Sequence, residues 1–91
     1  MKTYLISYDL IFPESSPQYE ALIKTIKTAT YWAKPLKSVW LIKTTLSSVS
    51  VLNQLRLVTD KNDKFLVIEV TNDWVSLNLS SDVVVWMKGG L

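Results

Sequence analysis

The sequence predicts a small α+β domain in which two helices cover one face of a mainly antiparallel sheet. Segments of strand and helix character alternate along the 91 residues, and short links join them. Hydrophobic residues make up 48% of the chain and charged residues 20%, which is enough to build one core. Such an alternation over a short chain favours a layered sandwich. We therefore expect a single domain over residues 1–91.

A first strand is expected at Lys2–Tyr8, which is rich in β-branched and aromatic residues. Tyr4, Ile6 and Tyr8 fall on one face of this strand and Leu5 on the other. Because both faces carry large side chains, we place the strand in the centre of the sheet.

A first helix is expected to begin after Ser16, because a serine followed by a proline, here Pro17, is typical of a helix N-terminus. The helix should end near Thr30. Its apolar side chains recur at helical spacing, which predicts one buried stripe: Tyr19, Leu22, Ile23 and Ile26.

Three further elements follow. Ser38–Thr44 has strong strand composition, and Ser47 or Ser48 can cap a second helix that runs to about Val58. Phe65–Val70 is a near-continuous apolar run, typical of a strand that is covered on both faces or paired centrally. Between the first helix and the second strand, residues 31–37 predict an irregular connection with room for a short strand.

The end of the chain is harder to assign. Val75, Leu77 and Leu79 alternate with polar residues and predict a short edge strand. Residues 83–85 are valines that favour a strand, whereas Ser81-Asp82 favours a helix cap, so both assignments stay open. The order of elements best fits a ferredoxin-like sandwich, which also needs a hairpin between its two helices.

Two residue types are absent, and their absence excludes much chemistry. Without cysteine or histidine the chain cannot form a disulfide, a Cys/His zinc site, a thiol nucleophile or a Ser/His relay. Carboxylate, hydroxyl and lysine chemistry remain, with or without a hard, oxygen-bound cation. The N-terminus lacks a signal-peptide pattern and no apolar run is long enough to span a membrane, so we expect a cytoplasmic protein.

Positive charge is concentrated in the middle of the chain. The net charge is only +2, but six basic and no acidic residues lie between Ala21 and Thr59. These residues either form solvated faces or bind phosphate. A tryptophan in the same stretch either packs under the first helix or stacks on a nucleobase. The candidate nucleic-acid-binding residues are Lys24, Lys27, Lys34, Lys37, Lys43 and Trp32.

Asp9 is the candidate catalytic and metal-binding residue, because it ends the first strand at the point where α/β layers place ligands. It could instead hydrogen-bond the backbone of the following loop, as aspartates after strands often do. Magnesium in proteins typically takes one or two carboxylates together with water and substrate phosphate. A lone aspartate is therefore half of a site, and a two-fold axis could supply the second carboxylate.

Several short motifs resemble the Cas two family of CRISPR-associated proteins, above all its small SinR-family members, with the VapD toxins as more distant relatives. These motifs are Tyr8-Asp9-Leu10, Ser38-Val39-Trp40, the Asn62-Asp63 turn and the strand that follows it. The resemblance covers about residues 2–71. Family members carry arginines where this chain has residues 12–17, and in that loop Glu14 would repel phosphate.

The resemblance implies a ferredoxin-like homodimer whose sheets pack together. Residues 72–91 would then form a C-terminal extension that contacts the partner. It implies that Asp9 pairs across the two-fold axis and holds Mg²⁺ for cleavage of RNA or DNA. It also implies a possible scaffold role in antiviral defence, with an integrase-like partner protein.

A different class of function stays open beside this one. A small structural or regulatory dimer would bind a protein partner without catalysis, and its ten aromatic residues, 11% of the chain, would form the interface.

Overall fold

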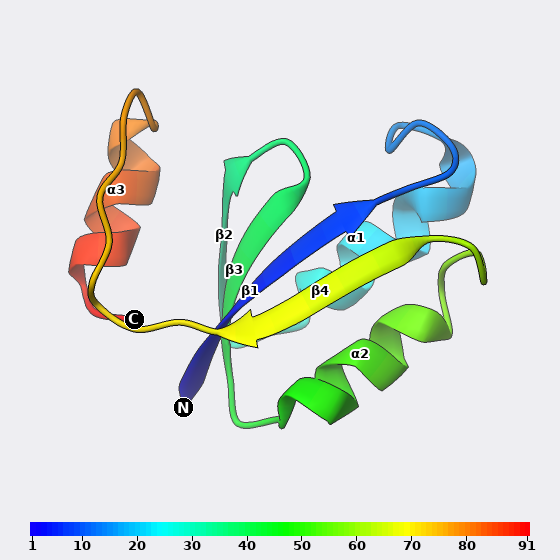
Figure 1. Ribbon diagram of the computed structural model, residues 1–91, viewed down its shortest axis with the longest axis horizontal. Coiled ribbons are helices and arrows are strands. Elements are labelled where there is room, and N and C mark those ends of the chain that lie inside the picture. The colour runs from blue at the N-terminus through cyan, green and yellow to red at the C-terminus, as the bar shows by residue number, and fades with distance from the viewer.

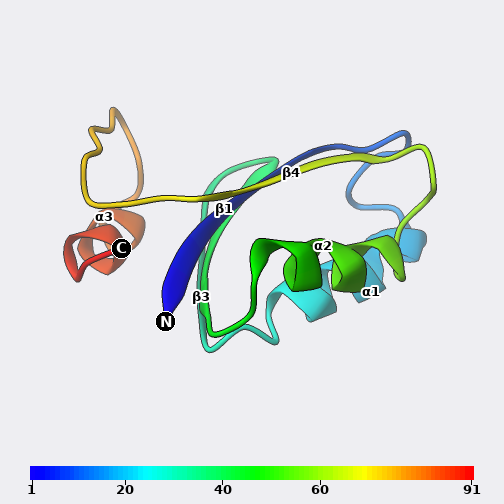
Figure 2. The same ribbon diagram turned by 60° about the horizontal axis from the view of Figure 1, so that its bottom comes forward.

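The computed structural model describes all residues from 1 to 91 and confirms the α+β class. Four strands form one antiparallel sheet in the order β2-β3-β1-β4. Along the chain, β1 (Lys2–Asp9) leads to α1 (Glu20–Ile26), β2 (Tyr31–Leu36) and β3 (Val39–Thr44), and then to α2 (Ser48–Arg56) and β4 (Lys64–Glu69). This strand order and connectivity is the ferredoxin-like arrangement, and α1 and α2 cover the same face of the sheet (Figures 1 and 2).

β1 lies in the middle of the sheet, as its composition predicts, and pairs with β3 on one side and with β4 on the other. Its two faces differ because successive side chains of a strand point in opposite directions. Tyr4, Ile6 and Tyr8 are buried under the helices. Thr3, Leu5, Ser7 and Asp9 belong to the other face. Thr3 and the neighbouring Leu41 of β3 are each 3% exposed, so this face is uncovered only towards β4 and the Asp9 end, and we call that part the open face.

The core lies between the sheet and the two helices. Leu22 of α1 and Leu55 of α2 are at most 1% exposed. The cluster also contains Trp40, for which a core position was expected. The remaining members come from the same strands and helices: Tyr4, Ile6, Tyr8, Tyr19, Ile26, Ile42 and Val51.

The helices begin close to the predicted positions. Ser47 caps α2, and its hydroxyl oxygen accepts a hydrogen bond from the backbone N–H of Ser50 at 3.2 Å. The first helix is shorter than predicted, because Pro17–Tyr19 form a turn of 3-10 helix before α1 and regular α-helix stops at Ile26. Ser16 occupies the N-cap position without a side-chain hydrogen bond.

β2 is a full strand where a largely irregular connection was expected. It lies at the edge of the sheet and completes the hairpin that the ferredoxin-like plan requires. Its Pro35 has no N–H to offer a neighbouring strand, but an edge position tolerates this, and the register shifts between Ala33 and Leu36.

The prediction of a strand at Val75–Leu79 is wrong, because this segment has no regular structure. Asn78 has a φ of 63°, a left-handed conformation that interrupts an extended chain. The chain then forms α3 (Ser81–Lys88), which resolves the open assignment of the tail in favour of a helix. Ser80 caps α3. The helix lies beside β2, away from α1 and α2 (Figure 1). None of the helices is long and apolar enough to cross a membrane.

β4 differs most from its prediction. Its apolar run suggested a strand covered on both faces or paired centrally, yet β4 is an edge strand. Its inward residues Phe65 and Val67 pack against the core, but Leu66 and Ile68 are 57% and 48% exposed on the open face. The structure of one chain therefore leaves an apolar strip uncovered beside β1.

We expect truncation of a buried side chain at the end of α2 to lower the free energy of unfolding far more than truncation of an exposed one nearby. Leu55→Ala should lower the free energy of unfolding by about 2–5 kcal/mol, because it removes a fully buried side chain and leaves a cavity. Leu57→Ala, at a position that is 85% exposed, is the matched control and should change it by less than about 0.5 kcal/mol. Urea denaturation followed by circular dichroism measures both values, and equal losses would contradict this packing.

Candidate functional site

Asp9 ends β1 and is exposed. Its carboxylate takes part in none of the side-chain hydrogen bonds or salt bridges of the structure, so the alternative that it bonds the following loop does not hold. Lys64 is its register partner in β4, and directly opposed residues of antiparallel strands share a face. The open face therefore carries one acidic and one basic group at this end of the sheet, beyond the apolar strip of Leu66 and Ile68.

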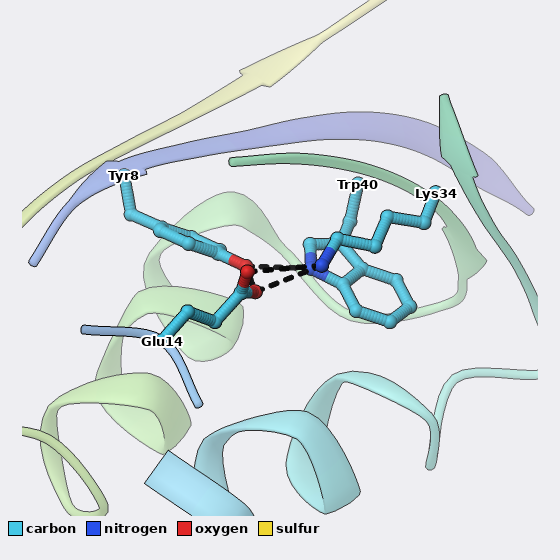
Figure 3. A network of polar contacts seen from close by, with 4 residues as sticks. All are labelled: Tyr8, Glu14, Lys34 and Trp40. Atoms are coloured by element: carbon cyan, nitrogen blue, oxygen red, sulfur yellow. Dashed lines mark hydrogen bonds and ion pairs between the residues drawn. The ribbon is translucent and has the colours of Figure 1, made fainter. Parts of the chain in front are cut away.

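Tyr8, the neighbour of Asp9, points to the other face and organises a polar network there (Figure 3). The indole N–H of Trp40 donates to the Tyr8 hydroxyl oxygen at 2.9 Å, and the Tyr8 hydroxyl donates to the carboxylate of Glu14. The Nζ of Lys34 lies 3.0 Å from both carboxylate oxygens of Glu14. Four residues from β1, β2, β3 and the loop after β1 are joined in this way.

This network changes the electrostatic interpretation of the loop. Glu14 is paired with Lys34, and the side chains are 28% and 33% exposed respectively. Its negative charge is therefore compensated within the protein, and the expectation that Glu14 repels phosphate loses its basis. Burial, reinforced by the bond to Glu14, raises the pKa of Tyr8 far above its usual range, so Tyr8 stays protonated and acts as a donor.

A second anchor holds the same loop from the other side. One carboxylate oxygen of Asp63 accepts from the backbone N–H of Ile11 at 2.9 Å and from the Tyr19 hydroxyl at 2.8 Å. The other oxygen accepts from the backbone N–H of Asp60 at 2.9 Å. Burial, followed by the bond to Asp63, raises the pKa of Tyr19. Asp63 is thus a turn residue, as its sequence context predicts, and it also ties the loop after β1 to the turn before β4.

The predicted lysines do not form one patch. Lys34 is held by Glu14, and the Nζ of Lys43 donates to the carbonyl oxygen of Gly90 and lies 4.8 Å above the ring of Trp86. Lys43 therefore fastens α3 to β3. Lys37 lies in the turn between β2 and β3 and is exposed.

Trp32 and the lysines of α1 form a separate group on the side of the sheet that the helices cover. Trp32 is 40% exposed, and its ring meets that of Trp40 edge-on, with 5.6 Å between centroids. The Nζ of Lys27 lies 4.8 Å from its ring centroid. Lys24 lies one turn earlier on the same helix. Trp32 therefore packs against the core and keeps part of its ring accessible, so neither of its two predicted roles is excluded.

Lys64 is the residue that sequence reasoning missed. It lies outside the basic middle of the chain, and only the register of β1 with β4 places it opposite Asp9. An antiparallel register is not readable from a strand of near-continuous apolar composition.

Asp9 is a candidate ligand for a hard cation, because its exposed carboxylate makes no bond within the chain. No group of three or more acidic side chains lies close enough together to hold a metal ion. Lys64 lies opposite Asp9 in the sheet, and the acidic residue before it, Asp63, already accepts hydrogen bonds from the backbone N–H groups of Ile11 and Asp60 and from the Tyr19 hydroxyl. Magnesium binds through one or two carboxylates and completes its shell with water and phosphate, so a lone exposed carboxylate meets its ligand needs only in part.

The raised pKa of Tyr8 predicts a loss of stability in alkali. A group with a raised pKa in the folded state contributes its full stability below its unfolded pKa, about 10 for tyrosine, and loses it as the pH rises further. Tyr8→Phe should lower stability at pH 8 by about 1–3 kcal/mol, since it removes the bonds to Glu14 and Trp40. Between pH 8 and pH 10.5, the free energy of unfolding of Tyr8→Phe should then fall by less than that of the wild type. Urea denaturation at both pH values tests this, and parallel losses in the two proteins would contradict it.

Comparisons with known proteins do not assign the chain to a family. No family model matches the chain, and no curated protein or solved structure matches it.

Proposed function

We propose that the chain acts as a homodimer that binds nucleic acid and cleaves a phosphodiester bond with Mg²⁺ held by Asp9 of both protomers. The observation that carries this proposal is the position of Asp9. Its free carboxylate lies on the open face beside a strip of uncovered apolar side chains, next to a lysine in strand register. The resemblance to the Cas two family supports the same reading.

The open face is the surface we assign to the dimer. A strand with apolar residues on both faces is usually covered on both faces, and β4 is covered on one. Leu66 and Ile68 lie on the uncovered side, and the partly exposed Leu5 continues the strip onto β1. A symmetric partner that presents the same strip would bury these side chains, because an isologous interface pairs a patch with itself.

The C-terminal segment is the second part of this interface. Val75, Leu77 and Val85 are 70% exposed or more, although Lys43 of β3 holds the end of the segment through Gly90 and the Leu91 N–H closes the segment onto the Asn72 side chain. These exposed apolar residues favour the role predicted for residues 72–91, which is to contact the partner.

In this dimer each side chain has a distinct task. Asp9 of each protomer would hold the metal ion, and Lys64 would bind a phosphate oxygen beside it. Bound magnesium would supply an activated water and would neutralise charge that develops on the phosphate. Glu14 and Lys34 take no part in the chemistry and keep the loop after β1 in place.

A non-catalytic role in binding a protein is the second candidate, favoured by the same exposed apolar residues. An integrase-like protein or another partner could cover Leu66 and Ile68 in place of a second copy. The two candidates differ in salt dependence, because phosphate binding weakens steeply as salt rises and an apolar interface does not.

Removal of the carboxylate should abolish cleavage without unfolding the chain. Asp9→Ala should reduce Mg²⁺-dependent cleavage of single-stranded RNA or DNA by at least about 100-fold, since half of each metal site is lost. The melting temperature should stay within a few degrees, because Asp9 is exposed and makes no side-chain bond. Cleavage that persists in this variant, or in the wild type with EDTA, would contradict the catalytic part of the proposal.

Charge placed on the open face should separate the protomers. Leu66→Lys should convert the dimer to a monomer in light scattering after size exclusion, because two buried lysines would face each other across the two-fold axis. Leu57→Lys adds the same charge at an exposed site directly after α2 and is the control. A wild-type chain that is monomeric at all concentrations, or a Leu66→Lys chain that stays dimeric, would contradict the assigned interface.

A further inference from the structure

We infer that Phe12 is a stacking platform for a nucleobase, and that the strand bound at Asp9 is therefore single-stranded. This inference rests on the proposed function, since it names the form of the substrate that reaches the same site. It begins with the loop of residues 10–16, which follows Asp9 directly.

The loop exposes apolar side chains instead of burying them. Leu10 packs against the core, but Ile11 and Phe12 are 47% and 46% exposed. An exposed phenylalanine forgoes the free energy that its burial would contribute. Two such residues in succession leave an apolar surface directly after the end of β1.

The loop is held rigidly, so the exposure of Phe12 is not a result of loose structure. Ile11 is fixed by its N–H bond to Asp63. Two residues after Phe12, Glu14 is fixed by Tyr8 and Lys34 (Figure 3). The backbone N–H of Ser16 closes a turn onto the carbonyl oxygen of Pro13 at 2.9 Å. A contact on a platform held from both sides costs little conformational entropy.

The position of Phe12 suits a base beside a bound phosphate. It lies three positions after Asp9, so its Cα lies within about 11 Å of the Asp9 Cα. With Glu14 neutralised by Lys34, no uncompensated acid lies in the loop between Asp9 and α1. Phosphate at Asp9 and a base on Phe12 can therefore belong to one short stretch of the same strand.

An aromatic ring in such a place selects for an unpaired base. A base can stack on a protein ring only if its face is free, which is the case in single strands, loops and ends. Stacking is tolerant of sequence because every base has a π-face. The preference is therefore for single strands over duplexes, with little preference among bases.

Binding of labelled single strands by wild type and variants tests the inference. We would measure fluorescence anisotropy with oligothymidine, oligouridine and a DNA duplex, using Ca²⁺ in place of Mg²⁺. Phe12→Ala should weaken binding of both single strands about 5- to 150-fold, and Phe12→Trp should retain it. Ile11→Ala, which removes a neighbour of equal exposure without a ring, is the matched control and should bind like the wild type.

The outcomes separate this inference from the function on which it rests. Wild-type binding that Phe12→Ala leaves unchanged would overturn the stacking role and would leave the nucleic-acid function standing. Equal losses in Phe12→Ala and Ile11→Ala would also overturn it, since they would show a general apolar contact. A wild-type protein that binds none of the three probes at low salt would contradict the proposed function itself. Wild-type binding to the duplex as tight as to the single strands would also overturn the inference, since a paired base offers no free face to the ring.

Discussion

Tyr8 and Asp9 are neighbours at the end of the central strand, and the alternation of a β-strand directs them to opposite faces of the sheet. Tyr8 lies under the helices, where Trp40 donates to its hydroxyl oxygen and its own proton goes to Glu14. Asp9 lies on the open face with a free carboxylate. The rigid loop and the candidate metal ligand thus both depend on the register of β1, and a shift of one residue would exchange their surroundings.

The register of β1 is well determined because both of its neighbours constrain it. Six residue pairs join it to β3 and six join it to β4. The buried residues Tyr4 and Ile6 fix which face meets the helices. The candidate site is accordingly placed by the most strongly paired element of the fold, and a site on such an element is held more precisely than one on a loop.

The sequence alone was enough to predict those helices and strands whose residue pattern has a single physical explanation. Alternation defined the faces of β1, helical spacing defined the buried stripe of α1, and Ser47 marked the start of α2. It was insufficient where composition has several explanations. Val75, Leu77 and Leu79 alternate as in a strand, but no neighbouring strand pairs with them in this chain and Asn78 turns the backbone aside. Among the candidate site residues, Asp9 was proposed from its place at a strand end, which the structure confirms as a position only. Lys64 and the Glu14–Lys34 pair depend on contacts between distant segments.

The prediction that β4 is covered on both faces was wrong for the single chain, and the reason is physical. The pattern of Phe65 to Ile68 is that of a strand with two covered faces, and the folded chain covers only one. A pattern that fits an assembly better than it fits a monomer is what an obligate interface would leave in a sequence, because its apolar side chains are buried only when the partner is present.

The same reasoning connects the apolar strip with Asp9. The proposed magnesium site takes one carboxylate, that of Asp9, from each chain. A two-fold partner placed on this face would bury the strip and would bring a second carboxylate to the same end of the sheet, so one symmetric contact would meet both needs.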